Sequence, residues 1–203
     1  MIKIVRANKL SNKNKLLINK IFIDSFYDYF KSFCDDKSKL YKIFKNVLNI
    51  DKYYAVLLDD TAVAIGGIGK GESTLILKKS KFVLNLGFDK GNRAFKYFNL
   101  IFQERDYAFE MDDMCAMIEF IAVDEEYRNK NIGYTLINHI MFDNEYERYM
   151  VKVANNNSNA ISLVEKAGFE EFDVEKSKVK ETEDVGVDHY CFMIRENPKF
   201  MEK

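Results

Sequence analysis

The segment 119–134, EFIAVDEEYRNKNIGY, combines an apolar stretch, a basic loop and a glycine in an order that suits anion binding. The apolar stretch ends at Val123, Arg128 and Lys130 supply positive charge, and Gly133 lets a ligand approach the backbone closely. An amphipathic helix is predicted to follow, and a helix N-terminus with its backbone N–H groups binds phosphate well. The segment therefore predicts a diphosphate site, although an ordinary solvated turn would show the same composition. The predicted amide donors are those of Asn129, Lys130, Asn131, Ile132, Gly133 and Tyr134.

Two motifs resemble those of the GNAT superfamily of N-acetyltransferases, which use acetyl-coenzyme A (acetyl-CoA) as acyl donor. The first, IAVDEEYRNKNIGYTLI, resembles the acyl-CoA signature (Arg or Gln, two residues, Gly, one residue, Gly or Ala) through Arg128 and Gly133. Asn131 replaces the middle glycine, a mild departure because asparagine tolerates a positive φ. The second motif, NSNAISLVEKAGFEEF, follows in the expected order and at a normal separation. Its matching residues are Asn157, Ala160, Leu163, Glu165, Lys166, Gly168 and Phe169.

The resemblance implies where acetyl-CoA binds and how it reacts. The cofactor would lie in a cleft where two neighbouring parallel strands, ending near Val123 and Ala154, splay apart. The pantetheine arm would pair with the backbone of Ile121, Ala122 and Val123, and the pyrophosphate would bind the loop 128–134. The acceptor amine would attack the thioester directly. The backbone N–H of Val123 would polarise the thioester carbonyl, as an oxyanion hole does.

The same resemblance points to the groups that handle protons. An amine attacks only after it has lost its proton, and Glu119 is the candidate base. Strand alternation predicts that Glu119 lies on the same face as Ile121 and Val123, and a structural glutamate is the alternative. Many family members carry a tyrosine in the later motif that protonates the departing CoA thiolate, but Val164 occupies that position here. Water or another hydroxyl would take this role, with Tyr134 and Tyr190 as candidates.

Three further features leave alternatives open. Asn157 is expected to hydrogen-bond the pantetheine or a catalytic water, and asparagine is also a favoured helix N-cap. His189 and Cys191 share a strand face by alternation, and they either pack in the core or line the acceptor pocket. Aromatic residues before the fourth core strand either pack a helix onto the sheet or wall the acceptor site. They are Phe95, Tyr97, Phe98, Phe102, Tyr107 and Phe109.

Hydrophobic periodicity predicts an α/β fold that can position these residues. Strands are expected over 2–5, 53–58, 62–68, 116–123, 149–154, 169–174 and 189–195. Helices are expected over 16–33, 39–48, 75–86, 94–107, 133–142 and 158–166. The chain is interpreted as one domain over 1–203, because no linker-like composition flanks the helical insertion at 74–110. The resemblance and the element order together predict a mixed, twisted sheet of six or seven strands, flanked by helices.

Composition excludes several classes of function. Lysine plus arginine total 31 and aspartate plus glutamate total 32, and this balance argues against a dedicated nucleic-acid-binding protein. The N-terminus lacks the apolar region of a signal peptide, and no apolar run reaches the roughly 20 residues of a membrane span. Cys34, Cys115 and Cys191 match no zinc spacing, so they are expected to be reduced thiols in a cytoplasmic protein without a metal.

These expectations converge on an acetyl-CoA-dependent N-acetyltransferase that modifies a primary amine of a small molecule or a protein. The alternative is a CoA-binding sensor or regulatory module without turnover, which the valine at position 164 keeps open. No nucleic-acid or membrane partner is expected. Family members are often dimers, which leaves a homodimer open, and the fold does not select the acceptor.

Overall fold

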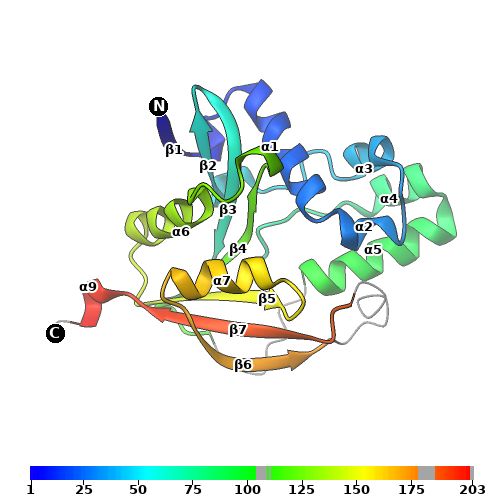
Figure 1. Ribbon diagram of the computed structural model, residues 1–203. Helices are drawn as coiled ribbons and strands as arrows, with labels where there is room; N and C mark the ends of the chain where they lie inside the picture. The colour runs from blue at the N-terminus through cyan, green and yellow to red at the C-terminus, as the bar shows by residue number, and fades with distance from the viewer. Residues whose placement is uncertain (104–108, 110, 178–185, 202–203) are drawn as a thin grey trace.

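A seven-stranded mixed sheet forms the centre of the computed structural model, which describes residues 1–103, 109, 111–177 and 186–201 (Figure 1). Its strands are β1 (Ile2–Arg6), β2 (Tyr53–Leu58), β3 (Thr61–Gly69), β4 (Cys115–Val123), β5 (Arg148–Ala154), β6 (Glu170–Lys176) and β7 (His189–Glu196). The sheet order is β1-β2-β3-β4-β5-β7-β6, and only β4 and β5 pair in parallel. The predicted strands and the mixed α/β sheet are therefore confirmed.

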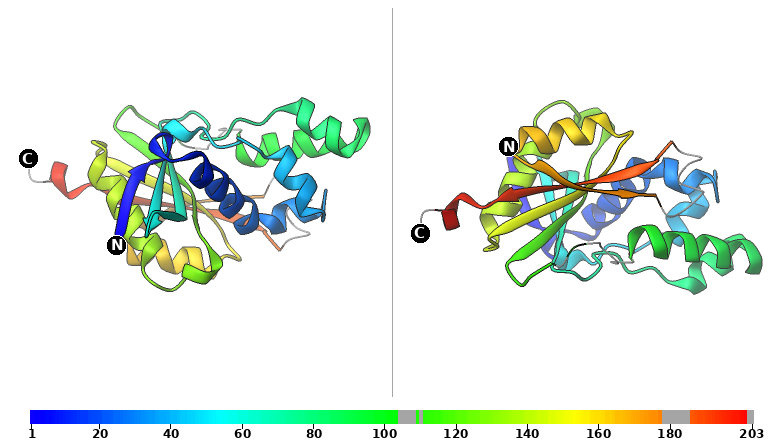
Figure 2. Two further views of the ribbon diagram at one scale, coloured as in Figure 1. Left: turned by 90° about the horizontal axis from the view of Figure 1, so that it is seen from above. Right: turned by 90° about the horizontal axis from the view of Figure 1, so that it is seen from below.

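Helices cover both faces of the sheet, as Figure 2 shows from above and below. The first face carries α1 (Asn12–Ser25), α2 (Tyr27–Lys31), α3 (Lys37–Ile43), α4 (Lys79–Leu86) and α5 (Phe88–Phe102). The second face carries α6 (Ile132–Asp143) and α7 (Ser158–Lys166). Short helices complete the fold: η1 (Ala7–Lys9), η2 (Ile50–Lys52), η3 (Glu125–Tyr127) and α9 (Pro198–Met201). Within the described part of the chain, no helix combines the length and hydrophobicity required to cross a bilayer.

The first two predicted helices have wrong boundaries, and side-chain caps explain the difference. The stretch predicted as one helix over 16–33 is two helices, α1 and α2, which meet at Phe26. Ser11 caps α1 by accepting a hydrogen bond from the N–H of the third helical residue, so the helix begins earlier than hydrophobic spacing suggests. Asp36 caps α3 in the same way, and this helix therefore starts before the predicted 39–48 segment.

The segment before β4 contains two helices, as predicted, but both begin elsewhere. Leu75 forms an isolated antiparallel bridge with Leu48, so α4 starts only after this extended stretch. The second helix, α5, follows Gly87, whose φ of +83° suits glycine. Gly91 therefore lies inside α5, which begins before the predicted start at residue 94. The predicted continuation over 104–107 lies outside the described residues.

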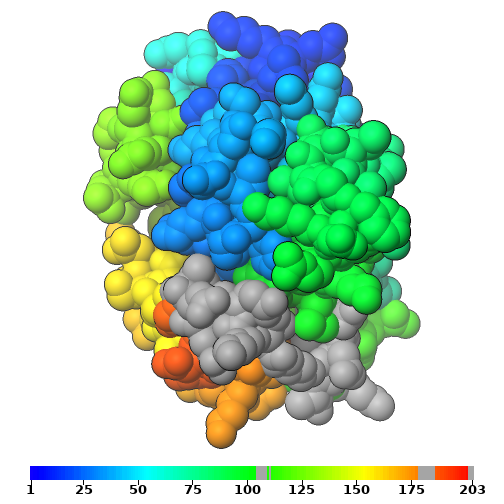
Figure 3. Space-filling view, turned by 90° about the vertical axis from the view of Figure 1, so that its right-hand side faces the viewer, coloured from blue at the N-terminus to red at the C-terminus, as the bar shows by residue number. Residues whose placement is uncertain are grey.

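Aromatic side chains pack the segment before β4 against α2. The ring of Phe98 lies 5.3 Å from that of Phe30, and the ring of Tyr97 lies 5.0 Å from that of Phe33. The space-filling view shows these two regions, blue and green, side by side (Figure 3). The packing alternative is thus confirmed for Tyr97 and Phe98, which are almost fully buried. The predicted aromatic residue Tyr107 lies outside the described residues.

Gly91 allows α4 and α5 to pack closely, and its replacement should destabilise the protein. A Cβ atom at Gly91 would lie 2.6 Å from the Cα of Val83 and 2.7 Å from backbone atoms of Phe82. Overpacking typically costs about 1–3 kcal/mol, and the upper part of this range, about 2–3 kcal/mol, applies here because the obstructing atoms belong to the backbone. The better helix propensity of alanine returns about 1 kcal/mol. We therefore expect Gly91→Ala to lower the free energy of unfolding by about 1–2 kcal/mol in chemical denaturation.

The matched control for Gly91→Ala is Arg93→Ala, at an exposed position of the same helix. It should change the free energy of unfolding by no more than about 0.5 kcal/mol. Equal stability of Gly91→Ala and the wild type would contradict the close contact between the two helices.

Candidate functional site

The parallel strands β4 and β5 separate after a short paired stretch. Residues 115–117 of β4 pair with residues 148–150 of β5. Beyond these pairs, β4 continues along β3 to Val123 and β5 continues along β7 to Ala154. The two strands run in different directions in Figure 1. A cavity of about 210 Å³ opens between them, as the resemblance implies.

A β-bulge in β4 lies at the wall of this cavity. Phe120 has a φ of +51°, which a non-glycine residue seldom adopts. The pairing with β3 shifts here, because Gly67 opposes Glu119 whereas Ile65 opposes Ala122. Two residues of β4 are thus matched by a single residue of β3, and such an extra residue reverses the alternation of side chains.

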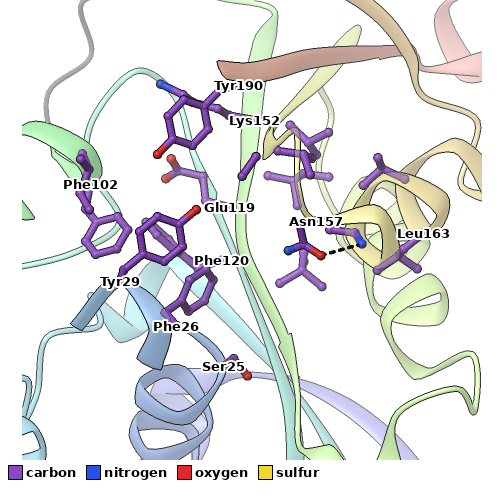
Figure 4. A pocket seen from close by; sticks show the side chains of 18 residues that line it. Ser25, Phe26, Tyr29, Phe102, Glu119, Phe120, Lys152, Asn157, Leu163 and Tyr190 are labelled. Atoms are coloured by element: carbon purple, nitrogen blue, oxygen red, sulfur yellow. Dashed lines mark hydrogen bonds between the residues drawn. The ribbon is translucent and has the colours of Figure 1, made fainter. Parts of the chain in front are cut away.

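The bulge places Glu119 on the opposite face of the strand from Ile121 and Val123. Those two residues pack in the core formed with α6 and α7. Glu119 instead accepts a hydrogen bond at its Oε2 from the Thr74 hydroxyl at 3.0 Å, and Thr74 lies 3.2 Å from the hydroxyl of Tyr53. The prediction of a shared face is therefore wrong, because it assumed regular alternation. Glu119 nevertheless lines the cavity (Figure 4). The buried Thr74 fixes its carboxylate from behind through the hydrogen bond.

Two tyrosine hydroxyls lie beside the Glu119 carboxylate in Figure 4. Tyr29 and Tyr190 line the cavity, and their hydroxyls hydrogen-bond to each other. Burial raises the pKa of both phenols above the ordinary value of about 10, and the neighbouring Tyr29 raises the pKa of Tyr190 further. Both groups are therefore protonated at neutral pH. Of the residues considered for this wall, Cys191 is buried in the core instead.

Phenylalanine side chains close the rest of this end of the cavity. The ring of Phe120 lies 5.5 Å from the ring of Phe26 and 5.5 Å from the ring of Phe102. All three residues line the cavity, and Tyr29 packs against Phe102 at 5.9 Å. Phe102 comes from α5, so the segment before β4 both packs on the fold and walls the cavity. Sequence spacing alone could not separate these two roles.

The opposite end of the cavity is formed by α7. Asn157 caps this helix, because its Oδ1 accepts a hydrogen bond from the N–H of Ala160 at 3.1 Å (Figure 4). Asn157 also lines the cavity, where its amide nitrogen is a further donor. Leu163 and Val164 follow on the same wall. The position where the later motif often has a tyrosine is therefore apolar here.

The basic loop between β4 and α6 holds two asparagines in the left-handed conformation. Asn129 and Asn131 have φ values of +60° and +59°, which confirms the expectation for Asn131. The N–H groups that open α6, beginning at Ile132, have no acceptor within the helix. The Nζ of Lys166, from the end of α7, donates to the Oδ1 of Asn131 at 2.8 Å and adds positive charge to the loop.

The basic side chains of the loop contact its own carbonyl groups. Arg128 Nε donates to the carbonyl oxygen of Val123 at 3.2 Å, and Lys130 Nζ donates to that of Glu126 at 3.0 Å. Both side chains remain exposed. They can therefore neutralise an anion at the loop while they also brace it.

Gly133 joins the loop to the cavity. A Cβ atom there would lie 3.0 Å from Leu163 Cδ2 and 3.6 Å from Val123 Cγ2. Gly133 therefore allows α6 and α7 to pack closely, whereas the sequence predicted that it lets a ligand approach the backbone. Because Leu163 also lines the cavity, the start of α6 is adjacent to the cavity wall.

The backbone at the end of β4 is directed into the gap. The N–H of Asp124 donates to the carbonyl of Val63 on β3 at 2.9 Å. Successive N–H groups of a strand point to opposite edges, so the N–H of Val123 points away from β3 and toward the gap. The predicted residues thus fall into groups: Glu119, Ile121 and Asn157 line the cavity, and Val123 and the loop 128–134 lie at its β4 end.

Ala122 does not line the cavity, because its side chain packs in the core of the first sheet face. The backbone contact expected for Ala122 stays a prediction. Sequence reasoning did not connect Phe26, Tyr29 and Phe102 with Glu119. Among the described residues, no group of three or more His, Cys, Asp or Glu side chains is placed to hold a metal ion.

The cysteines offer no activated nucleophile. Cys34, Cys115 and Cys191 are buried, and burial raises the pKa of Cys115 and of Cys191 to about 11. Raising a thiol pKa from its ordinary range by about two units lowers the thiolate fraction about 100-fold. We therefore expect a thiol reagent at pH 8 to modify Cys115 and Cys191 at least about 100 times more slowly in the native protein than in the guanidinium-unfolded protein, as peptide mapping by mass spectrometry would measure. Rapid reaction of either native thiol would contradict this.

Comparisons with known proteins identify a family and a fold. The sequence profile of the acetyltransferase (GNAT) family matches residues 18–169. No curated protein matches the chain. An N-acetyltransferase structure from Staphylococcus aureus Mu50 is similar, with 15% identity, a TM-score of 0.61, and coverage of 95% of this chain and 100% of that chain.

Two further solved structures share the fold. PH1933 from Pyrococcus horikoshii OT3 has 17% identity and a TM-score of 0.55, with 97% of this chain and 99% of that chain covered. The ribosomal-protein-S18-alanine N-acetyltransferase from Escherichia coli has 14% identity and a TM-score of 0.51, with 97% and 94% covered. At such low sequence identities, structural similarity shows a shared fold and no more.

Proposed function

Because the chain belongs to the acetyltransferase (GNAT) family, we propose that it transfers an acetyl group from acetyl-CoA to a primary amine. The cavity between the diverging strands β4 and β5 carries this proposal, since it adjoins the basic loop at the start of α6. At about 210 Å³ the cavity is smaller than a pocket that encloses a whole ligand; such pockets measure about 300–1,000 Å³. It suits the thioester end of the donor, with the nucleotide outside on the loop.

The loop and the end of β4 would hold acetyl-CoA through backbone and charge. The N–H groups that open α6 face the pyrophosphate, and Arg128, Lys130 and Lys166 neutralise it. The backbone of Val123 pairs with the pantetheine amides as an added strand would. Its carbonyl can accept a second hydrogen bond beside that from Arg128, because it has two lone pairs. Asn157 donates to the pantetheine from the other wall.

Glu119 and Val123 would divide the chemical work between them. Glu119 accepts a proton from the acceptor ammonium, which frees the nitrogen lone pair. The nitrogen bonds to the thioester carbon while the N–H of Val123 stabilises the negative charge on the carbonyl oxygen. The carbon–sulfur bond then breaks. The nitrogen still carries two protons, and it passes one of them through water to the departing CoA thiolate. The products are the amide and the CoA thiol, and the proton held by Glu119 returns to solvent.

Tyr190 lies in the cavity, but it is poorly suited to be the acid. Burial raises its pKa above about 10, whereas a free thiol has a pKa near 8.5. Proton transfer from Tyr190 to the thiolate is therefore uphill. Tyr134 packs in the second core and beside Lys166 instead. We assign hydrogen bonding to Tyr190 and protonation of the thiolate to water.

Calorimetry with acetyl-CoA, followed by mass spectrometry of an amine panel, tests the proposal. We expect binding of acetyl-CoA, then equal amounts of acetylated amine and free CoA. Binding without turnover on any amine would support the CoA-sensor alternative, which the apolar Val164 motivates. Absence of binding by the folded protein would overturn both.

A further inference from the structure

We infer that the acceptor is a small amine with one cationic centre on an aromatic or other apolar body. This inference rests on the proposed acetyl transfer and concerns the end of the cavity around Glu119. We call this end the aromatic chamber, and it is formed by Phe26, Tyr29, Phe102, Glu119, Phe120 and Tyr190. Five of its six residues have aromatic side chains.

The bulge in β4 separates the aromatic chamber from the donor side of the cavity. Ile121 and Val123 face the core of α6 and α7, where the cofactor loop begins. Glu119 lies on the other face of the strand, toward α1, α2 and α5. Donor and acceptor therefore approach the gap from opposite faces of the sheet. The acceptor meets the aromatic chamber, so this chamber selects it.

The six described residues of the aromatic chamber include one carboxylate, which can therefore pair with one cationic group of an acceptor. Among the described residues that line the cavity, Glu119 is the carboxylate and Lys152 is the cation. Lys152 Nζ lies 4.5 Å from the centre of the Tyr190 ring and pairs with Glu175 at 2.8 Å. Lys152 is thus already paired, and a polyamine would bring additional ammonium groups toward apolar walls. Burying each unpaired charge is costly, so such acceptors are disfavoured.

The rings supply affinity for the rest of the acceptor. Phe26, Phe102 and Phe120 meet edge to face at 5.5–6.4 Å, a geometry that a further aromatic ring can join. Ring faces near Glu119 also attract an ammonium through cation–π interaction. The two neutral tyrosine hydroxyls can hydrogen-bond the nitrogen. An apolar monoamine therefore uses each feature of the chamber.

Competition between 2-phenylethylamine, butylamine, spermidine and a peptide N-terminus tests the inference. Saturation-transfer NMR in the presence of CoA measures binding, and product analysis with acetyl-CoA measures turnover. We expect 2-phenylethylamine to exceed spermidine and the peptide by at least about tenfold in both measurements, corresponding to about 1.4 kcal/mol. Preference for spermidine or the peptide would overturn the inference and leave acetyl transfer intact. Selective binding without acetylation would overturn the transfer and leave the chamber's preference intact.

A pair of variants on α5 provides the residue-level test. Phe102→Leu keeps most of the volume but removes a ring of the aromatic chamber. Phe95→Leu makes the same change on the same helix, where Phe95 packs on Phe82 at 5.8 Å outside the cavity lining. We expect Phe102→Leu to raise the KM for 2-phenylethylamine about three- to tenfold, with the KM for acetyl-CoA unchanged. Equal effects of the two variants, or equal effects on butylamine and 2-phenylethylamine, would contradict the assignment.

Discussion

Replacing Glu119 by glutamine should lower turnover about 100- to 10,000-fold, the range expected for loss of a positioned base. The amide has nearly the same shape and can still accept the hydrogen bond from Thr74. It cannot take a proton from an ammonium group, so only acceptor molecules that arrive as free amine would react. Steady-state kinetics with saturating acetyl-CoA measures the loss. Calorimetry should show unchanged acetyl-CoA affinity, because Glu119 lies on the opposite face of β4 from the donor side.

The pH profile distinguishes a base from a structural carboxylate. Below the pKa of the acceptor, the free-amine fraction rises about tenfold per pH unit, and the rate of Glu119→Gln should follow it. Glu145→Gln is the matched control, because Glu145 is exposed and precedes β5 at the end away from the gap. It should retain wild-type kinetics. If Glu119→Gln also keeps the wild-type rate across the pH range, the assignment of Glu119 as base is wrong.

Reversing the charge of Arg128 should weaken acetyl-CoA binding about 10- to 100-fold, since a charge-assisted hydrogen bond contributes about 1.5–3 kcal/mol. The guanidinium is exposed at the loop where the pyrophosphate is proposed to bind. Arg128→Glu replaces attraction by repulsion and also removes the hydrogen bond to the Val123 carbonyl. Calorimetry at low and moderate salt measures the effect. The difference from wild type should shrink as salt screens the charges.

Lys90→Glu controls for the altered net charge of Arg128→Glu. It makes an equal change at an exposed position on α5, on the other face of the sheet from α6. It should leave acetyl-CoA affinity unchanged. Folded Arg128→Glu protein with wild-type affinity at low salt would count against the placement of the pyrophosphate on the loop.

Local patterns predicted the strands and helices around the loop 128–134 well. Strand and helix boundaries near β4, β5, α6 and α7 follow from hydrophobic spacing, and asparagine at 131 indicated a left-handed residue. The N-cap role of Asn157 could also be predicted, because a cap depends on residues only two or three positions away. These features require no knowledge of distant contacts.

The position of Glu119 could not be predicted from regular alternation, because a bulge depends on the partner strand. A signal was present in Gly66 and Gly67, since glycine inside a strand often marks a bulge or a close approach. A Cβ atom at Gly66 would lie 2.4 Å from Ile121 Cδ1. Ile121 and α6 lie over Gly66 on the second face of the sheet, so a side chain at position 66 would collide with them.

The aromatic chamber could not be predicted from local sequence patterns, for a different reason. Phe26, Phe102 and Tyr190 come from α1–α2, α5 and β7, which the fold brings together at one end of the gap. Each aromatic residue alone resembles a core residue. Only tertiary contacts separate Phe98, which is buried in the core, from Phe102, which borders the cavity.

The most direct test of the account is the structure of the protein with bound acetyl-CoA. We expect the thioester between β4 and β5, with its carbonyl oxygen about 2.7–3.1 Å from the Val123 nitrogen and the pyrophosphate on residues 128–134. Acetyl-CoA bound elsewhere, or a gap filled by side chains at saturating ligand, would contradict the proposed transfer site.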